Sequence, residues 1–237
     1  MEHQRRVGLI VPSSNSVMEV DFYRNLPEHC TLHVARMHLS ETTVAGENAM
    51  LDDFLPQAVE DLASVRPHVV VFGCTSAGAL RGNEYDRQLC RDIGRRTGAR
   101  VVSVIASVRE ALKQTGARSI GVVTPYVDEL NDRIRSSLET DGFQVPVVSG
   151  LGISENFLIA AVDPETIASF AAREIDGKPV DAVFISCTNF RGLQAAGLVN
   201  RVLGVPVVTS NGAALEAARR LMGLTLGSRN QNGGDTK

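Results

Sequence analysis

An internal repeat at a constant offset of 113 residues restricts the fold of this chain more than any other feature. The segment VVVFGCTSAGAL (69–80) aligns with AVFISCTNFRGL (182–193). The same offset pairs Gly8 and Pro12 with Gly121 and Pro125, which lie in the segment IGVVTP (120–125). Separate motifs that share one offset indicate a duplication, so we predict two similar halves with a boundary near residues 115–119. The alternative is one larger doubly wound sheet with accidental similarity.

Strand and helix patterns alternate within each half. Helical spacing and stop signals predict helices that include 52–65, 84–97 and 107–114. Apolar runs typical of strands buried inside a parallel sheet occupy residues 7–11, 69–72, 101–105, 120–124, 182–186 and 205–209, with weaker runs at 32–37 and 145–148. This alternation predicts an α/β fold: two doubly wound parallel-sheet halves related by a pseudo-two-fold axis, with the active site in the cleft between them.

The predicted domain division follows from the repeat. We assign residues 6–115 to the first half and 116–210 to the second, and we expect the C-terminal helix 211–224 to pack on the first half. The tail 225–237 is polar and glycine-rich, and we expect it to be disordered.

Three local signals predict where helices begin. They are a capping-box pattern at 16–19 (SVME), a Thr-Pro pair at 124–125 and an Asp-Pro pair at 163–164. In each, a side-chain oxygen is placed to accept a hydrogen bond from a free N–H group of the first helical turn.

The composition excludes several classes of protein. Hydrophobic residues make up 43% of the 237 residues and the formal net charge is −3, which argues against a disordered chain and against a basic nucleic-acid-binding face. No apolar run approaches the length of a membrane-spanning helix, and the apolar stretch near the N-terminus is too short for a signal peptide. We therefore expect no nucleic-acid or membrane partner, a cytoplasmic location and four reduced cysteines.

Two cysteines occupy equivalent places in the two halves. Cys74 and Cys187 each follow the last apolar residue of a predicted strand and precede a hydroxyl residue. Ligands of open α/β sheets bind beyond the carboxyl ends of the strands, and N–H groups at a helix start lower the pKa of a thiol. We therefore expect two reactive thiols that face each other across one cleft. The alternative is that both are small buried residues, the role we assign to Cys30 and Cys90.

Several motifs make the chain resemble the Asp/Glu racemase superfamily, specifically the branch of maleate cis-trans isomerases and arylmalonate decarboxylases. The resemblance implies a cofactor-free enzyme that buries a substrate carboxylate between two α/β domains, and a homodimer or homotetramer. The segments 186–193 and 205–217 are closer to a branch associated with ectoine utilisation, which leaves the substrate open. The motifs, within residues 6–224, are VGLIVPSSNSVME (7–19), GCTS (73–76), TPY (124–126), ENF (155–157) and SCTN (186–189).

The resemblance also implies roles for individual residues. In maleate isomerases the first-half cysteine attacks the double bond, the covalent intermediate rotates about its new single bond, and the second cysteine donates and accepts the proton. Carried over by motif, Cys74 is the nucleophile and Cys187 the acid and base. The decarboxylase branch keeps only the second-half cysteine, so the pair favours an isomerase or a racemase. The expected substrate-binding residues are Asn15, Thr75, Ser76, Tyr126, Asn156, Thr188 and Asn189.

The residues by themselves leave other roles open. Asn15 could form a turn or a helix cap as well as bind a substrate carboxylate, and Tyr126 could simply pack in the core. No local sequence pattern marks Asn156 as a binding residue. We interpret Arg191 as a surface charge rather than a carboxylate clamp. No phosphate loop or nucleotide fingerprint is present, and the His- and Cys-containing segment 29–38 lacks a second ligand cluster, so we expect no cofactor and no metal.

These observations predict a cofactor-independent isomerase of a small carboxylate, converting maleate to fumarate through a covalent adduct on Cys74. Three alternatives remain: a two-thiol racemase of an amino acid or hydantoin-like compound, an arylmalonate-type decarboxylase, and a non-enzymatic sensor of small acids. Proton removal next to a carboxylate and addition to an enoate both place charge on that carboxylate. The same hydrogen-bond donors serve both reactions, so the sequence does not separate them.

Overall fold

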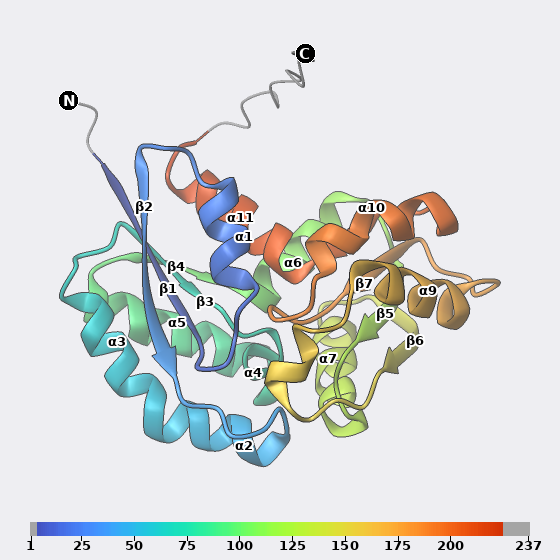
Figure 1. Ribbon diagram of the computed structural model, residues 1–237, viewed down its shortest axis with the longest axis horizontal. Helices are drawn as coiled ribbons and strands as arrows, with labels where there is room; N and C mark the ends of the chain where they lie inside the picture. The colour runs from blue at the N-terminus through green and yellow to red at the C-terminus, as the bar shows by residue number, and fades with distance from the viewer. Residues whose placement is uncertain (1–3, 225–237) are drawn as a thin grey trace.

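The computed structural model describes residues 4–224, which form two four-stranded parallel sheets flanked by helices (Figure 1). The first sheet has the order β2-β1-β3-β4 and the second the order β6-β5-β7-β8. Because the order is the same, β1 corresponds to β5 and β3 to β7, which confirms the predicted two-half α/β fold. The strands are β1 (Arg5–Pro12), β2 (Cys30–Met37), β3 (Val69–Phe72), β4 (Arg100–Ser103), β5 (Ser119–Thr124), β6 (Gln144–Gly150), β7 (Ala182–Ile185) and β8 (Val207–Thr209).

The most apolar runs form the inner strands. β3 pairs with both β1 and β4, and β7 pairs with both β5 and β8. Every residue of β3 and β7 is buried, because each strand has a neighbour on both edges and helices on both faces. The continuous VVVF and AVFI segments are therefore explained by their central positions.

The helices of the first half lie on both faces of its sheet, as Figure 1 shows. α3 packs against β1, β2 and α5 on one face, while α1 packs against α11 on the other. A single long helical segment begins at α2 and passes through the π-helical turn η1 into α3. The bounds are α1 (Met18–Asn25), α2 (Val44–Ala49), η1 (Met50–Phe54), α3 (Leu55–Ala63), α4 (Thr75–Leu80), α5 (Asn83–Thr97) and α6 (Val104–Gln114).

The helices of the second half repeat this plan. α7 packs against β6 and against α4 of the first half, while α9 and α10 pack against each other. Their bounds are α7 (Asp128–Thr140), α8 (Asn156–Ile159), α9 (Pro164–Ile175), α10 (Gly192–Leu203) and α11 (Ser210–Leu221).

Two corresponding helices join the halves. α6 follows β4 and α11 follows β8, and these two helices pack against each other. α11 also contacts β3 and β4 of the first sheet, whereas α6 contacts β8 of the second. The division at residues 115–116 stays a prediction, and the tail 225–237 lies outside the described residues.

Two of the predicted helix starts are wrong. At 16–19 no capping box forms: the Ser16 N–H donates to Asn189 Oδ1, and Glu19 pairs with Arg36. After β5 the helix begins only at Asp128, because Thr124 Oγ1 bonds the Asn131 side chain instead of capping a helix. The Asp-Pro start at 163–164 is confirmed, since the Asp163 side chain accepts from the Thr166 N–H.

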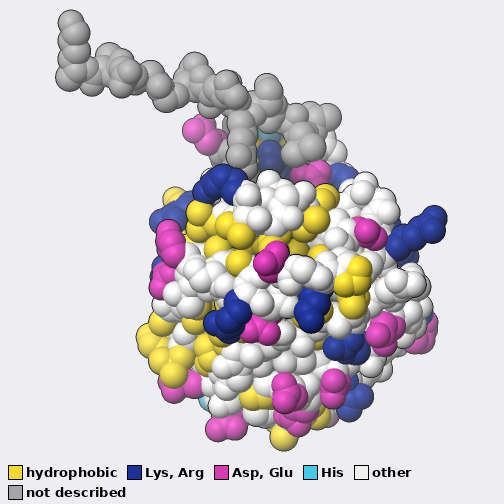
Figure 2. Space-filling view, turned by 90° about the vertical axis from the view of Figure 1, so that its right-hand side faces the viewer, with side chains coloured by type: hydrophobic (Ala, Val, Ile, Leu, Met, Phe, Trp, Pro, Cys, Tyr) yellow, Lys and Arg dark blue, Asp and Glu magenta, His cyan; other side chains and the backbone are white. Residues whose placement is uncertain are grey.

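The surface mixes charges of both signs. Figure 2 shows acidic and basic side chains interspersed on the face where α9 and α10 lie, with scattered apolar patches. Within residues 4–224, no helix is both long and apolar enough to cross a membrane.

Candidate active site

The candidate active site lies where the carboxyl ends of the two sheets meet. Asn15 follows β1, Cys74 follows β3, Tyr126 follows β5 and Cys187 follows β7, and all four side chains are buried. The Thr188 hydroxyl, next to Cys187, donates to the Gly73 carbonyl, next to Cys74, at 3.0 Å. The fold thus brings the two repeated motifs side by side, although they are 113 residues apart.

Cys74 is fixed by the close packing of the strand end before it. A Cβ atom on Gly73 would lie 2.8 Å from the Ile10 carbonyl oxygen and 2.9 Å from Met18 Sδ, so only glycine fits between β1 and α1. Cys74 itself is the residue immediately before α4 and is 5% exposed. Its Sγ lies 3.8 Å from the Ser76 hydroxyl.

Cys187 is held in a different backbone conformation. Its φ of 100° lies in a region that residues other than glycine rarely adopt, and its N–H donates to Ser210 Oγ at 3.1 Å. The Asn189 N–H donates to Cys187 Sγ at 3.3 Å, and the Tyr126 hydroxyl also bonds this sulfur. Together with the Phe190 N–H, these donors face the sulfur of Cys187.

Burial keeps both thiols protonated at neutral pH. Desolvation raises the pKa of Cys187 to about 11, against the opposing hydrogen bonds from Asn189 and Tyr126. Desolvation, followed by the negative charge of Glu47, raises the pKa of Cys74 well above its ordinary value. The Ala77 N–H at the start of α4 does lower the pKa of Cys74, as we expected for helix-start N–H groups, but desolvation outweighs this effect. Each thiol consequently needs a base in order to react.

Hydroxyl groups near the cysteines join the two halves. Thr75 Oγ1 donates to Ser210 Oγ at 2.8 Å, and Ser210 in turn accepts from the Cys187 N–H. Thr188 Oγ1 accepts from Asn15 Nδ2 at 3.0 Å. The hydroxyls of Thr75 and Thr188 are therefore hydrogen-bonded to other groups of the protein. Ser210, just after β8, was not expected; its only signal is a hydroxyl residue directly after a strand.

Three amide side chains continue this network. Asn15 Oδ1 accepts from the N–H groups of Val17 and Met18, so Asn15 caps α1 as well as reaching Thr188. Asn189 Nδ2 donates to the Asn156 carbonyl at 2.6 Å. Asn156 Nδ2 donates to Ser14 Oγ at 2.8 Å. All seven expected binding residues thus lie around the cysteines or in the hydrogen-bond network beside them; their contact with a substrate stays a prediction.

Glu47, on α2, is a site residue that the sequence analysis missed. It is fully buried, it accepts from the Ser76 hydroxyl at Oε1, and its Oε2 has no hydrogen-bond partner. Desolvation raises its pKa to about 8. A signal was present: Glu47 lies four residues before Leu51, in line with the buried stripe that continues along this helix through Leu55 and Val59.

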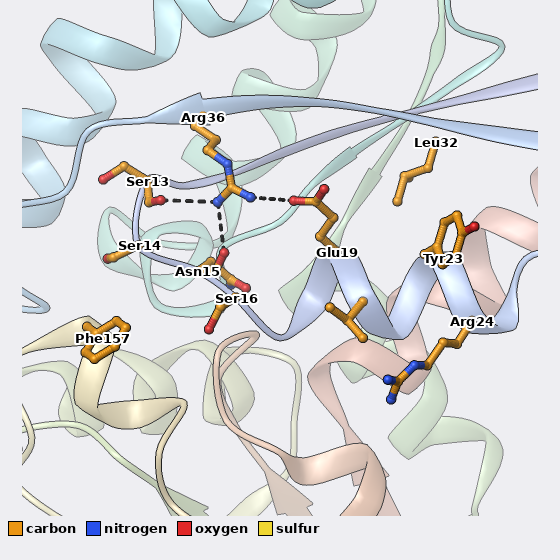
Figure 3. Close-up of a pocket in the computed structure, with 11 residues that line it drawn as sticks. Ser13, Ser14, Asn15, Ser16, Glu19, Tyr23, Arg24, Leu32, Arg36 and Phe157 are labelled. Atoms are coloured by element: carbon orange, nitrogen blue, oxygen red, sulfur yellow. Dashed lines mark hydrogen bonds and ion pairs between the residues drawn. The ribbon is translucent and has the colours of Figure 1, made fainter.

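A surface groove lies beside this site rather than at the cysteines. It has a volume of about 940 Å³, and Figure 3 shows it between α1, the loop after β1 and Phe157. Arg36 crosses it, bonding the Asn15 carbonyl at 2.8 Å and pairing with Glu19. Neither cysteine lines it. Across residues 4–224, no group of three His, Cys, Asp or Glu side chains is placed to hold a metal ion.

The model of the arylmalonate decarboxylase family matches residues 7–233. The chain belongs to this family. The match also confirms the predicted superfamily branch, because the relatives of the chain include both maleate isomerases and arylmalonate decarboxylases.

Two relatives represent these two activities. A maleate isomerase of Pseudomonas putida is 29% identical over 218 residues, which cover 86% of each chain. An arylmalonate decarboxylase of Bordetella bronchiseptica is 28% identical and covers 92% of this chain and 90% of its own length.

Solved structures of family members have the same fold. The maleate isomerase Iso of Pseudomonas putida S16, as a Cys-to-Ala variant with maleate, superposes with a TM-score of 0.86 and 25% identity, covering 93% of this chain and 92% of that one. A Cys-to-Ser variant of the Nocardia farcinica maleate cis-trans isomerase, with a covalently bound succinylcysteine intermediate, gives a TM-score of 0.84 and 26% identity, covering 93% of each chain.

Proposed function

We propose that the protein is a cofactor-independent cis-trans isomerase of a small dicarboxylate, converting maleate to fumarate. One observation carries the proposal: two cysteines from equivalent strand ends are buried together in a single site. The similarity to maleate isomerases, one of which has been captured as a succinylcysteine intermediate, supports maleate as the substrate.

The proposed reaction uses the two sulfurs in turn. Cys74 Sγ, as thiolate, bonds to one alkene carbon, and the alkene electron pair moves onto the other carbon and its carboxylate. That carbon takes the proton of Cys187, which gives a succinyl thioether on Cys74. After rotation about the new single bond, the Cys187 thiolate removes a proton, the double bond forms again in the trans geometry, and the carbon–sulfur bond breaks.

The surroundings of the site suit this sequence. The Asn189 N–H and the Tyr126 hydroxyl face Cys187 Sγ, where they stabilise the thiolate formed when Cys187 gives up its proton. Neutral donors such as the amide of Asn156 are well suited to a carboxylate that gains charge, at about 3–4 kcal/mol for each well-placed donor.

Mass spectrometry of the protein incubated with maleate tests the proposal. In the unmodified protein we expect fumarate production. In Cys187→Ser we expect an adduct of succinyl mass to accumulate on Cys74, because the serine hydroxyl or water can still supply a proton to the carbanion, whereas neither is a strong enough base to remove one. Cys74→Ser should form no adduct and no fumarate. Incorporation of solvent deuterium into an unchanged amino acid, or carbon dioxide release from an aryl malonate, would instead support a racemase or a decarboxylase.

We also propose a cytoplasmic location and a homodimer or homotetramer. Family membership supports the assembly, and the similarity to bacterial maleate isomerases supports the location. Light scattering of the purified protein checks the subunit number; a monomer at working concentration would contradict it.

A further inference from the structure

Ser76 connects Cys74 to a buried carboxyl group. Its Oγ lies 3.8 Å from Cys74 Sγ and donates to Glu47 Oε1. A serine hydroxyl has one proton to donate. When Glu47 is ionised it can only accept this proton, so the Ser76 oxygen offers its lone pairs to Cys74, and the Cys74 S–H becomes the donor. The three groups form a directed chain from sulfur to hydroxyl to carboxyl.

The other cysteine has a different set of partners. Cys187 Sγ receives an N–H from Asn189 and the hydroxyl of Tyr126. These donors stabilise a sulfur that already carries charge, whereas the Ser76–Glu47 chain offers Cys74 a place for its proton. Cys74 Sγ also receives a backbone N–H, from Ala77, so the feature that separates the two repeated cysteines is the Ser76–Glu47 chain beside Cys74.

We propose that Ser76 and Glu47 form a proton relay that deprotonates Cys74 when it attacks the substrate. The proton of Cys74 Sγ moves to Ser76 Oγ while the proton of Ser76 moves to Glu47 Oε1, and the sulfur lone pair then bonds to carbon. The reverse transfers restore the thiol after the carbon–sulfur bond breaks. Glu47 acts through Ser76, and the inference rests on the proposed role of Cys74 as the nucleophile.

The charges around Glu47 favour proton uptake. Among residues 4–224, the titratable groups that act on Glu47 or on which Glu47 acts are Cys74, Cys187, Tyr126 and Glu129, and none of these four is cationic. The guanidinium of Arg81, which directly follows α4, donates its hydrogen bonds to Asn48, Asp52 and Tyr85 rather than to Glu47. A buried carboxylate without a cation is costly, so transfer of a proton to Glu47 removes an unfavourable charge.

The pH range of the relay follows from the carboxyl group. Desolvation raises the pKa of Glu47 to about 8, the bond from Ser76 opposes this shift, and Glu129 adds to it. A base must be ionised to accept a proton, so the relay becomes active as the pH rises through about 8.

Alkylation of Cys74 by iodoacetamide, measured at each pH by peptide mass spectrometry, tests the relay without any substrate. In the unmodified protein we expect the labelling rate to rise through a step near pH 8, where Glu47 ionises. Glu47→Gln keeps the shape of the side chain but cannot accept the proton, so the step should disappear and labelling just above it should slow by about tenfold or more. Ser76→Ala, with Glu47 intact, should lose the step as well.

Glu129→Gln is the matched control. Glu129 lies on α7 and accepts from the Val44 N–H, whereas the Ser76 hydroxyl donates to Glu47. Removing its charge should keep the step and move it to lower pH, because Glu129 raises the pKa of Glu47. Circular dichroism of each variant reports whether it keeps the native fold. Cys187 labelling should become faster in Glu47→Gln, because Glu47 also raises the pKa of Cys187.

A purely electrostatic role for Glu47 gives the opposite result. Without a relay, Glu47→Gln removes a negative neighbour, lowers the pKa of Cys74 and speeds its labelling, and Ser76→Ala leaves the profile unchanged. That outcome would overturn the inference. If the step is lost as expected but maleate is not isomerised, the relay stands and the proposed substrate is wrong.

Discussion

Cys187 illustrates how much a single residue depends on its surroundings. Its backbone has a φ of 100°, a conformation that costs on the order of 1–3 kcal/mol for a residue with a side chain. The Ser210 hydroxyl and the Asn189 N–H hold the backbone and the sulfur in this position. Cys74, its partner in the repeat, has an ordinary φ of −138°. Equal sequence motifs have therefore produced two sulfurs with different environments.

Replacement of Tyr126 by phenylalanine should weaken Cys187 as an acid and base. The change removes the hydroxyl that opposes the raised pKa of Cys187, so this pKa should rise further above about 11. We expect alkylation of Cys187 at a fixed pH to slow by about tenfold, since one pKa unit is a factor of ten in thiolate. Tyr23→Phe, at a tyrosine that is 78% exposed, is the control and should change nothing. An unaltered Cys187 profile in Tyr126→Phe would contradict the assignment.

At the scale of elements, local signals place the helices approximately but do not decide their ends. α1 begins after Asn15, whose side-chain oxygen accepts two N–H groups of the first turn, and not through the Ser16 pattern. The Ser16 N–H instead donates to the side-chain oxygen of Asn189, which belongs to the other half. A tertiary contact has thus replaced the local cap.

A pair of alanine variants distinguishes the two possible caps of α1. Asn15→Ala removes the cap and the bond to Thr188, so we expect a loss of about 1–2 kcal/mol in the free energy of unfolding from the cap alone. Ser16→Ala should change stability by less than about 0.5 kcal/mol, because this exposed side chain makes no bond in the described structure. Urea unfolding measures both values. A larger loss of stability in Ser16→Ala would instead support Ser16 as the cap of α1.

For the whole molecule, a buried polar cluster joins the halves away from the cysteines. Arg109 on α6, 5% exposed, donates to the side chains of Asn83 on α5 and Ser137 on α7 at 2.8 and 3.1 Å. Its Nε also lies 3.2 Å from an oxygen of Asp141, just after α7. The cluster fixes α7 of the second half against α5 and α6 of the first.

Removal of this guanidinium should destabilise the entire fold. Arg109→Ala removes the buried cation beside Asp141 and one hydrogen-bond donor each from Asn83 and Ser137, and we expect a loss of about 3–5 kcal/mol in the free energy of unfolding. Lys113→Ala is the matched control: Lys113 also bonds Asp141, at 3.0 Å, but its side chain is 51% exposed, so it should cost less than about 1 kcal/mol. Similar losses in both variants would show that burial of the cluster does not matter.

At the site, sequence patterns predicted some features and missed those that depend on tertiary contacts. The repeat and the apolar runs predicted both sheets and the strand-end cysteines, because burial and strand position depend on local sequence. Glu47 and Ser210 were missed because their importance comes from neighbours distant along the chain. Glu47 lies beside Ser76, 29 residues away, and Ser210 beside Thr75, 135 residues away.

The sequence by itself determined two parallel α/β halves and the placement of a cysteine at the same strand end of each, because periodic burial and duplicated motifs are properties of the chain in order. Only the tertiary structure decided which groups face each sulfur, that burial raises the pKa of both thiols, and that Cys74 has a carboxyl within reach through Ser76. The physical reason is that desolvation and hydrogen-bond direction act through space, between segments that no sequence pattern places together.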